Sequence, residues 1–187
     1  MSGMFGSAVN FNQNLNSWNT QLVSNMSSMF DRAYNFNGNI TTWNTANVTY
    51  MNSMFYAARN FNQNINNWNT SKVTNTAAMF VAATIFNQSL NSWDTRLITN
   101  MSSMFVNSYL FNSNLANWNT SRVTTTQNMF GLAFLFNQDI SSWDTHSVTD
   151  MSNTFNAGTS VYTAASASAR ATLTGAKGWT ITDGGTI

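Results

Sequence analysis

The chain repeats one residue pattern every 25 positions, beginning at its first residue. We call each set of residues separated by multiples of 25 a column. The first phenylalanine column contains Phe5, Phe30, Phe55, Phe80, Phe105, Phe130 and Phe155. The second contains Phe11, Phe36, Phe61, Phe86, Phe111 and Phe136, and a tryptophan column contains Trp18, Trp43, Trp68, Trp93, Trp118 and Trp143. A fixed period of about 20–50 residues is typical of solenoids and propellers, so the pattern predicts one continuous stack of units.

The repeat also predicts the domain boundaries. Six complete units span residues 1–150, and a partial seventh extends to residue 161. The pattern then gives way to an Ala/Ser-rich segment, several glycines and a short apolar alternation at Trp179 and Ile181. Because the last core face of a solenoid must be covered, we expect a repeat domain over 1–161 and a C-terminal cap over 162–187.

Two periodicities occur within each unit. Met26, Met29, Phe30 and Ala33 have the i, i+3, i+4, i+7 spacing of one helical face. This spacing predicts a short helix over residues 25–34, with the hydroxyl of Ser24 as its N-cap.

A second pattern follows the second phenylalanine of each unit. The polar–apolar–polar alternation over residues 64–66 predicts a short strand that reaches the tryptophan. The sequence therefore predicts an α/β repeat solenoid with a short helix and a short parallel strand per 25-residue unit. An invariant asparagine column, Asn12 to Asn137, is expected to form an amide ladder along the stack.

Composition excludes several functional classes. Charged residues make up 7% of the chain and the net charge is +1, so there is no basic stripe for nucleic acid or an anionic membrane surface. No apolar run reaches the roughly 18 residues of a membrane helix. No signal peptide opens the chain; Met1 is in register with the later units, which suggests a fragment, a mature form or an array whose first face meets a partner.

Neither catalysis nor metal binding has a clear sequence basis. His146 is the only histidine, and its column otherwise varies. There is no cysteine, no repeated Ser/His/Asp set and no phosphate-binding loop, so we expect no enzymatic activity and no cofactor. Asp94, Asp139, Asp144 and Asp150 replace asparagines irregularly, and we expect no metal site from them.

The unit resembles a known surface-protein repeat. Residues 23–30 read VSNMSSMF and residues 98–105 read ITNMSSMF; the pattern begins again at Val148. This resembles the repeat of BspA-like leucine-rich-repeat surface proteins, which is also found in mycoplasma-type lipoprotein-associated surface proteins. Residues 178–185 resemble the end of such arrays. The resemblance implies a solenoid similar to leucine-rich repeats, a secreted or cell-surface location, adhesion or ligand binding, and no shared catalytic residues.

Variation between units predicts where partners bind. The columns at residues 21–22 and 31–35 vary most, and the later copies of the second are apolar. Since exposed apolar patches mark contacts, we expect a binding surface at the columns of residues 31–35. It contains Tyr34, Tyr56, Arg59, Ile85, Tyr109, Leu110, Phe134 and Leu135.

Asn-x-Ser/Thr motifs recur along the chain. Such motifs arise by chance in a sequence rich in these residues, and they matter only in a secretory eukaryotic host. Asn47 is the best glycosylation candidate, because its column varies and should be exposed. The other candidates are Asn25, Asn69, Asn100 and Asn119.

The functional expectation is a non-catalytic extracellular or cell-surface scaffold that binds a surface protein or glycan of a host or a neighbouring cell. The alternative is a self-assembling protein whose copies stack head to tail into fibres, since the first unit would present Met4, Phe5 and Trp18 without a preceding cap.

Overall fold

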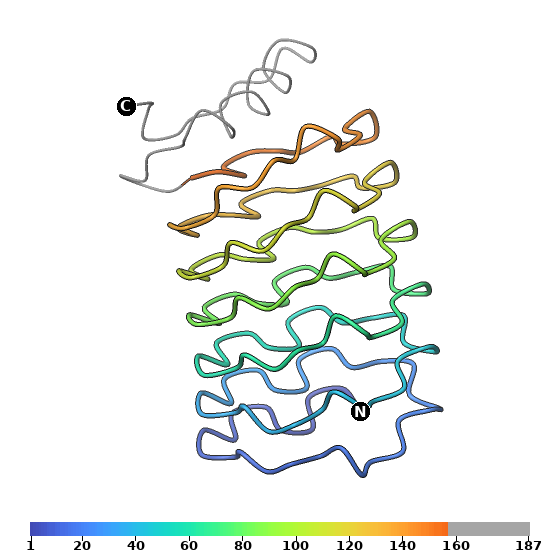
Figure 1. Cartoon of the computed structure of the whole chain (residues 1–187), viewed down its shortest axis with the longest axis vertical. Helices are drawn as coiled ribbons and strands as arrows, with labels where there is room; N and C mark the ends of the chain where they lie inside the picture. The colour runs from blue at the N-terminus through green and yellow to red at the C-terminus, as the bar shows by residue number, and fades with distance from the viewer. Residues whose placement is uncertain (157–187) are drawn as a thin grey trace.

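The computed structural model describes residues 1–156, which form a stack of similar layers. We call each 25-residue layer a rung: the first contains residues 1–25, the sixth contains 126–150, and residues 151–156 begin a seventh. Figure 1 shows the rungs lying one above another along the long axis, from blue at the N-terminal end to orange. The predicted cap over 162–187 lies outside the described residues.

The described residues contain no helix, so the predicted α/β solenoid of helix and strand units is wrong. In place of the expected helix over 25–34, backbone N–H groups alternate between two kinds of partner. Those of Met26, Ser28 and Phe30 donate to the carbonyls of Tyr50, Asn52 and Met54, each 24 residues further along the chain, at 2.9–3.0 Å. Those of Met29, Asp31 and Ala33 donate to the carbonyl three residues back. The segment is a series of turns whose remaining hydrogen bonds run between rungs.

Left-handed residues produce this path. Ser28 and Arg32 have φ of 54° and 56°, and the equivalent residues of the later rungs do the same. A left-handed residue interrupts a right-handed helix, so the i→i−4 pattern cannot propagate. The predicted stripe is nevertheless buried, because Met26, Met29 and Phe30 all point into the core. The periodicity identified the buried face correctly, but successive turns produce it.

The expected strand near Asn64–Trp68 is also absent. The Asn66 N–H donates to Asn64 Oδ1, and the Trp68 N–H donates to the Ile65 carbonyl, so this segment is two turns. Single parallel β-bridges occur elsewhere, in the column of Asn25, Tyr50 and Asn75. The predicted N-cap at Ser24 is also wrong, because no helix follows it. The Ser24 carbonyl instead accepts the Thr49 N–H of the next rung.

The apolar columns form one core through the whole stack. Ring centroids of successive residues in the first phenylalanine column lie 5.4–5.7 Å apart with nearly parallel planes. The second phenylalanine stacks on the first within a rung, as Phe55 and Phe61 do at 3.7 Å. Met151 and Phe155 continue their columns into the seventh rung. The predicted stacked core is confirmed.

Polar columns connect the rungs along the edge of this core. Trp68 is buried, and its indole Nε1 donates to the Ile40 carbonyl of the preceding rung. The asparagine column forms a ladder, but its donors are backbone N–H groups and not the side-chain amides that an amide ladder would use. Each side-chain oxygen accepts the backbone N–H of the next asparagine in the column, as Asn37 Oδ1 does from Asn62 N at 2.9 Å.

Candidate functional site

The predicted binding edge contains a solvent-exposed apolar half. Ile85, Tyr109, Leu110, Phe134 and Leu135 are between 39% and 52% exposed. The rings of Tyr109 and Phe134 stack with centroids 5.4 Å apart. Stacking between rungs therefore holds an aromatic and aliphatic strip in place on the surface of the fourth to sixth rungs.

The other half of the same edge is polar and internally paired. The Arg59 guanidinium lies 4.6 Å from the centre of the Tyr34 ring, and the Arg32 guanidinium lies 5.5 Å from that of Tyr56. Tyr34 and Tyr56 are half-buried. These cation–π contacts hold the tyrosine faces against arginine, so this half differs in chemistry from the apolar half. Seven of the eight predicted residues lie in the adjacent columns of residues 34 and 35, whereas Tyr56 lies in the column of residue 31. Their role in binding stays a prediction.

Most of the glycosylation motifs have a structural explanation. In Asn25, Asn69, Asn100 and Asn119, the side-chain oxygen accepts the backbone N–H two residues later, at 2.8–3.0 Å. Where that residue is Ser71, Ser102 or Ser121, its hydroxyl donates to the same oxygen at 2.7 Å. The Asn-x-Ser motif is thus a side-chain-capped turn that recurs because the fold recurs.

Asn47 is the exception among the candidates. It is exposed, as its variable column predicted. Its Nδ2 donates to the Gln21 carbonyl at 2.9 Å, and its Oδ1 accepts from Lys72 Nζ at 2.7 Å. Glycosylation at this residue stays a prediction.

The aspartates occupy the same capped turns. The Arg96 side chain, which donates two hydrogen bonds to Asp94, lowers the pKa of that carboxyl. Hydrogen bonds from Ser141 lower the pKa of Asp139, and those from Ser152 lower the pKa of Asp150. Among the described residues, no group of three or more His, Cys, Asp or Glu side chains could hold a metal ion.

His146 makes local contacts at the surface. Its Nδ1 lies 2.8 Å from Asp144 Oδ1, and its Nε2 lies 3.0 Å from the Ser147 hydroxyl. These three side chains are sequence neighbours on one exposed turn, where Asp144 Oδ1 also accepts the His146 N–H.

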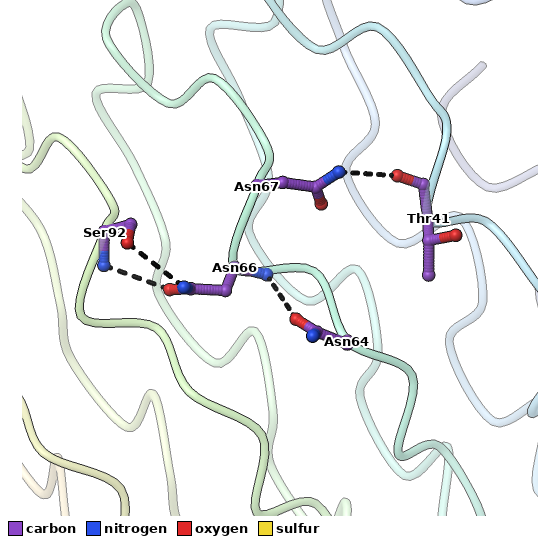
Figure 2. Close-up of a pocket in the computed structure, with 5 residues that line it drawn as sticks. All are labelled: Thr41, Asn64, Asn66, Asn67 and Ser92. Carbon is purple, nitrogen blue, oxygen red and sulfur yellow. Dashed lines mark hydrogen bonds between the residues drawn. The ribbon is translucent and has the colours of Figure 1, made fainter.

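Two surface depressions contain residues that were not predicted as a site. One, of about 500 Å³, is lined by Thr41, Asn64, Asn66, Asn67 and Ser92 (Figure 2). The other, of about 410 Å³, is lined by Ser71, Arg96, Leu97, Asn119, Ser121 and Arg122. The variable column at residues 21–22 contains Arg96, Leu97 and Arg122, so sequence variation was the signal that could have indicated the second depression.

Comparison with known families identifies the repeat. A family model described as "Mycoplasma protein of unknown function, DUF285" matches residues 1–93 and again residues 84–169. The chain belongs to this family. The expectation of a mycoplasma-type tandem repeat is therefore confirmed. No curated protein and no solved structure matches the chain.

The DUF285 family assignment agrees with the 25-residue stack, since both matches extend over several rungs. The structure adds one finding on membrane association: no helix in the described residues is both long and apolar enough to cross a bilayer.

Proposed function

We propose that this DUF285 protein is a non-catalytic binding scaffold that docks a partner protein on the apolar half of its variable edge. The observation that carries this proposal is the strip of Ile85, Tyr109, Leu110, Phe134 and Leu135, whose large side chains remain exposed while the other aromatic columns are buried. Exposed apolar side chains gathered in one strip are typical of protein contacts.

The geometry suits a rigid binding surface. Tyr109 and Phe134 stack on each other, so little side-chain entropy remains to be lost when a partner binds. The strip contains no charged side chain, whereas the adjoining polar half contains Arg32 and Arg59. An apolar centre bordered by paired polar groups resembles the core and rim of a protein interface.

The proposed setting is a secreted or cell-surface location, with a role in adhesion. This part of the proposal is supported by the resemblance of the repeat to BspA-like surface proteins. Antibody labelling of intact source cells tests it, with permeabilised cells as the control. Labelling that requires permeabilisation would contradict a surface location.

Binding to intact neighbouring cells tests the docking surface. The purified chain is expected to bind, and Phe134→Ser combined with Leu135→Ser is expected to reduce binding at least about tenfold. Leu22→Ser is the matched control, because Leu22 is 91% exposed but lies on a different corner of the rung. All variants should melt at nearly the same temperature as the parent chain, since the substituted side chains are exposed. Equal losses in the control and the edge variant would contradict the proposal.

A further inference from the structure

The cations of the described chain are unevenly distributed. Residues 1–156 contain five lysines and arginines, and Lys72, Arg96 and Arg122 lie in the adjacent columns at residues 21 and 22 of three successive rungs. The other two, Arg32 and Arg59, lie on the aromatic edge. The depression of about 410 Å³ that Arg96 and Arg122 line is therefore the centre of a small cationic corner.

Arg122 differs from the other described arginines. Arg96 forms an ion pair with Asp94 at 2.6 Å, Arg32 contacts Asp31 and Tyr56, and Arg59 covers Tyr34. Within residues 1–156, Arg122 makes no ion pair, hydrogen bond or cation–π contact. Its planar guanidinium remains available to bind a carboxylate through two parallel hydrogen bonds.

The nearby acids do not neutralise Arg122. Asp94 is occupied by two hydrogen bonds from Arg96, which also account for its lowered pKa. Asp144, one rung beyond Asn119, contacts the His146 ring at 2.8 Å. Lys72 adds a further positive charge on the opposite side, with its ammonium held by Asn47 Oδ1.

The other residues around Arg122 can bind hydroxyl groups. Asn119 Oδ1 accepts two hydrogen bonds from Ser121, which leaves the two N–H groups of its Nδ2 without an acceptor in the described chain. The Ser71 hydroxyl donates to Asn69, and its oxygen can still accept a hydrogen bond. Leu97 supplies the apolar part of the wall. The depression thus combines the unpaired Arg122, the acid-paired Arg96, amide and hydroxyl groups, and a single aliphatic side chain.

Residues of the amide-lined depression precede this corner closely in the sequence. In the third rung, Asn64, Asn66 and Asn67 precede Ser71 by only a few residues. Hydrogen bonds between rungs fix these amides, as Figure 2 shows: Asn67 Nδ2 donates to the Thr41 carbonyl, and Asn66 exchanges two hydrogen bonds with Ser92.

Two groups of the amide-lined depression remain unpaired. Asn67 Oδ1 and Asn64 Nδ2 have no hydrogen-bond partner within residues 1–156, although the rest of each amide is held in place. These fixed groups can bind hydroxyls with little loss of side-chain entropy.

From these observations we infer that the two depressions bind an acidic saccharide. Arg122 binds the carboxylate of one sugar, Asn119 and the neighbouring serines bind its hydroxyls, and the amide-lined depression binds an adjoining neutral part of the same chain. This site is independent of the apolar strip, which lies at Ile85, Tyr109, Leu110, Phe134 and Leu135 of the fourth to sixth rungs.

The chemistry favours a saccharide over other acidic ligands. Nucleic acid and anionic membranes need a basic stripe or a cluster of about four to eight cations, and this corner contains three. An acidic peptide would require apolar pockets for its side chains and backbone partners along a free strand edge, whereas the wall here consists mainly of hydroxyls and amides. Both depressions fall within the roughly 300–1,000 Å³ of small-ligand sites.

Titration calorimetry with defined oligosaccharides tests the inference. Trigalacturonate and sialyllactose present carboxylates from two sugar classes, and the methyl ester of trigalacturonate and lactose are their neutral counterparts. At least one acid sugar should bind, while its neutral counterpart binds at least about tenfold more weakly. No binding of either acid sugar, or equal binding of the neutral counterparts, would overturn the inference. A triglutamate peptide that binds as tightly as the sugar would also overturn it.

Variants separate a specific site from overall charge. Arg122→Gln should weaken binding of the acid sugar about tenfold. Arg122→Lys keeps the charge but loses the planar guanidinium that donates two parallel hydrogen bonds, so it should weaken binding less. Arg59→Gln is the matched control, because it removes the same charge from the aromatic edge, outside both depressions. A loss in Arg59→Gln as large as in Arg122→Gln would overturn the inference.

Two further measurements do not depend on the fold of the Arg122 variants. In the parent chain, nuclear magnetic resonance signals of Leu97 and Asn119 should shift on titration, while those of Asn35 and Asn60 should not. Asn64→Ser keeps the turn, since Ser89 caps the same turn in the next rung, but it removes the free amide. This variant should weaken binding of trigalacturonate and leave that of monogalacturonate unchanged. Shifts restricted to Asn35 and Asn60, or no effect of Asn64→Ser, would contradict the extended site.

Discussion

Trp68 Nε1 donates a hydrogen bond to the Ile40 carbonyl, 3.3 Å away in the preceding rung. The equivalent tryptophans from Trp43 to Trp143 repeat this bond at 2.9–3.2 Å. The Trp68 ring also stacks on Trp43, with centroids 6.2 Å apart. One side chain therefore fills the core and donates to a carbonyl that also accepts the backbone N–H of Trp43, which makes the tryptophan column a connection between rungs as well as a core element.

Replacing Trp68 by alanine should destabilise the stack by about 3–5 kcal/mol, because a buried aromatic is lost and a cavity remains. Urea unfolding measures the change, and hydrogen exchange should show the third rung opening first, since rungs contact only their neighbours. Trp68→Phe keeps a buried ring but removes the indole donor from the Ile40 carbonyl, which still accepts the Trp43 N–H. Its loss should therefore be smaller, about 0.5–1.5 kcal/mol. An unchanged unfolding curve for Trp68→Ala would contradict a core role.

The left-handed residues offer a route to a more stable protein. Leu132 has φ of 56°, an unfavourable backbone conformation for leucine, and at 36% exposure its side chain is only partly buried. Leu132→Gly should stabilise the protein by about 0.5–1 kcal/mol after the larger entropy of the unfolded glycine chain is subtracted. Thermal melting measures this. Leu22→Gly, at an exposed leucine outside the left-handed set, should instead destabilise; the same sign in both variants would contradict the explanation.

The asparagine ladder should be sensitive at its side-chain oxygen. Asn62 Oδ1 accepts from the backbone N–H of Asn87 and from Gln88 Nε2, both at 3.1 Å. Asn62→Ala leaves both donors without this acceptor and should cost about 1–3 kcal/mol in unfolding free energy. Asn62→Asp retains an acceptor and should lose much less. Equal losses in the two variants would show that the oxygen is not the important group.

Stability should fall in acid because of the capping aspartates. Hydrogen bonds from Ser152 stabilise the ionised Asp150 and lower its pKa in the folded state. Its contribution is therefore present above the unfolded pKa of about 3.9 and is lost as pH falls through the lower folded pKa. The effect is small because the group is near the surface.

A triple variant tests this pH dependence. Asp94→Asn, Asp139→Asn and Asp150→Asn together keep the caps, as asparagines do in other rungs, but remove the titration. Melting temperatures of the parent chain should fall between about pH 5 and 2, and those of the triple variant should fall less. Parallel curves for the two proteins would contradict this explanation.

The candidate surfaces depended on both sequence and structure. Variation at residues 34–35 and their equivalents indicated an exposed edge, and Phe134 and Leu135 are exposed there. The pairing of Arg59 with Tyr34, and the isolation of Arg122 from any acid, could not be predicted. These relationships depend on side-chain contacts between residues 25 or more positions apart.

The sequence by itself determined the stack and its core. An unbroken 25-residue period with phenylalanine, methionine and tryptophan columns can bury its apolar groups only if the units lie in register, and the aromatic ladders are the result. Tertiary structure decided the backbone conformation. The spacing of Met26, Met29, Phe30 and Ala33 fits one face of a helix and also fits successive turns, because both bury the same side chains. A helix would satisfy its own N–H groups, whereas here carbonyls 24 residues further along the chain accept from Met26, Ser28 and Phe30. Those acceptors exist only after the rungs have stacked, so a single unit does not specify the conformation that the array adopts.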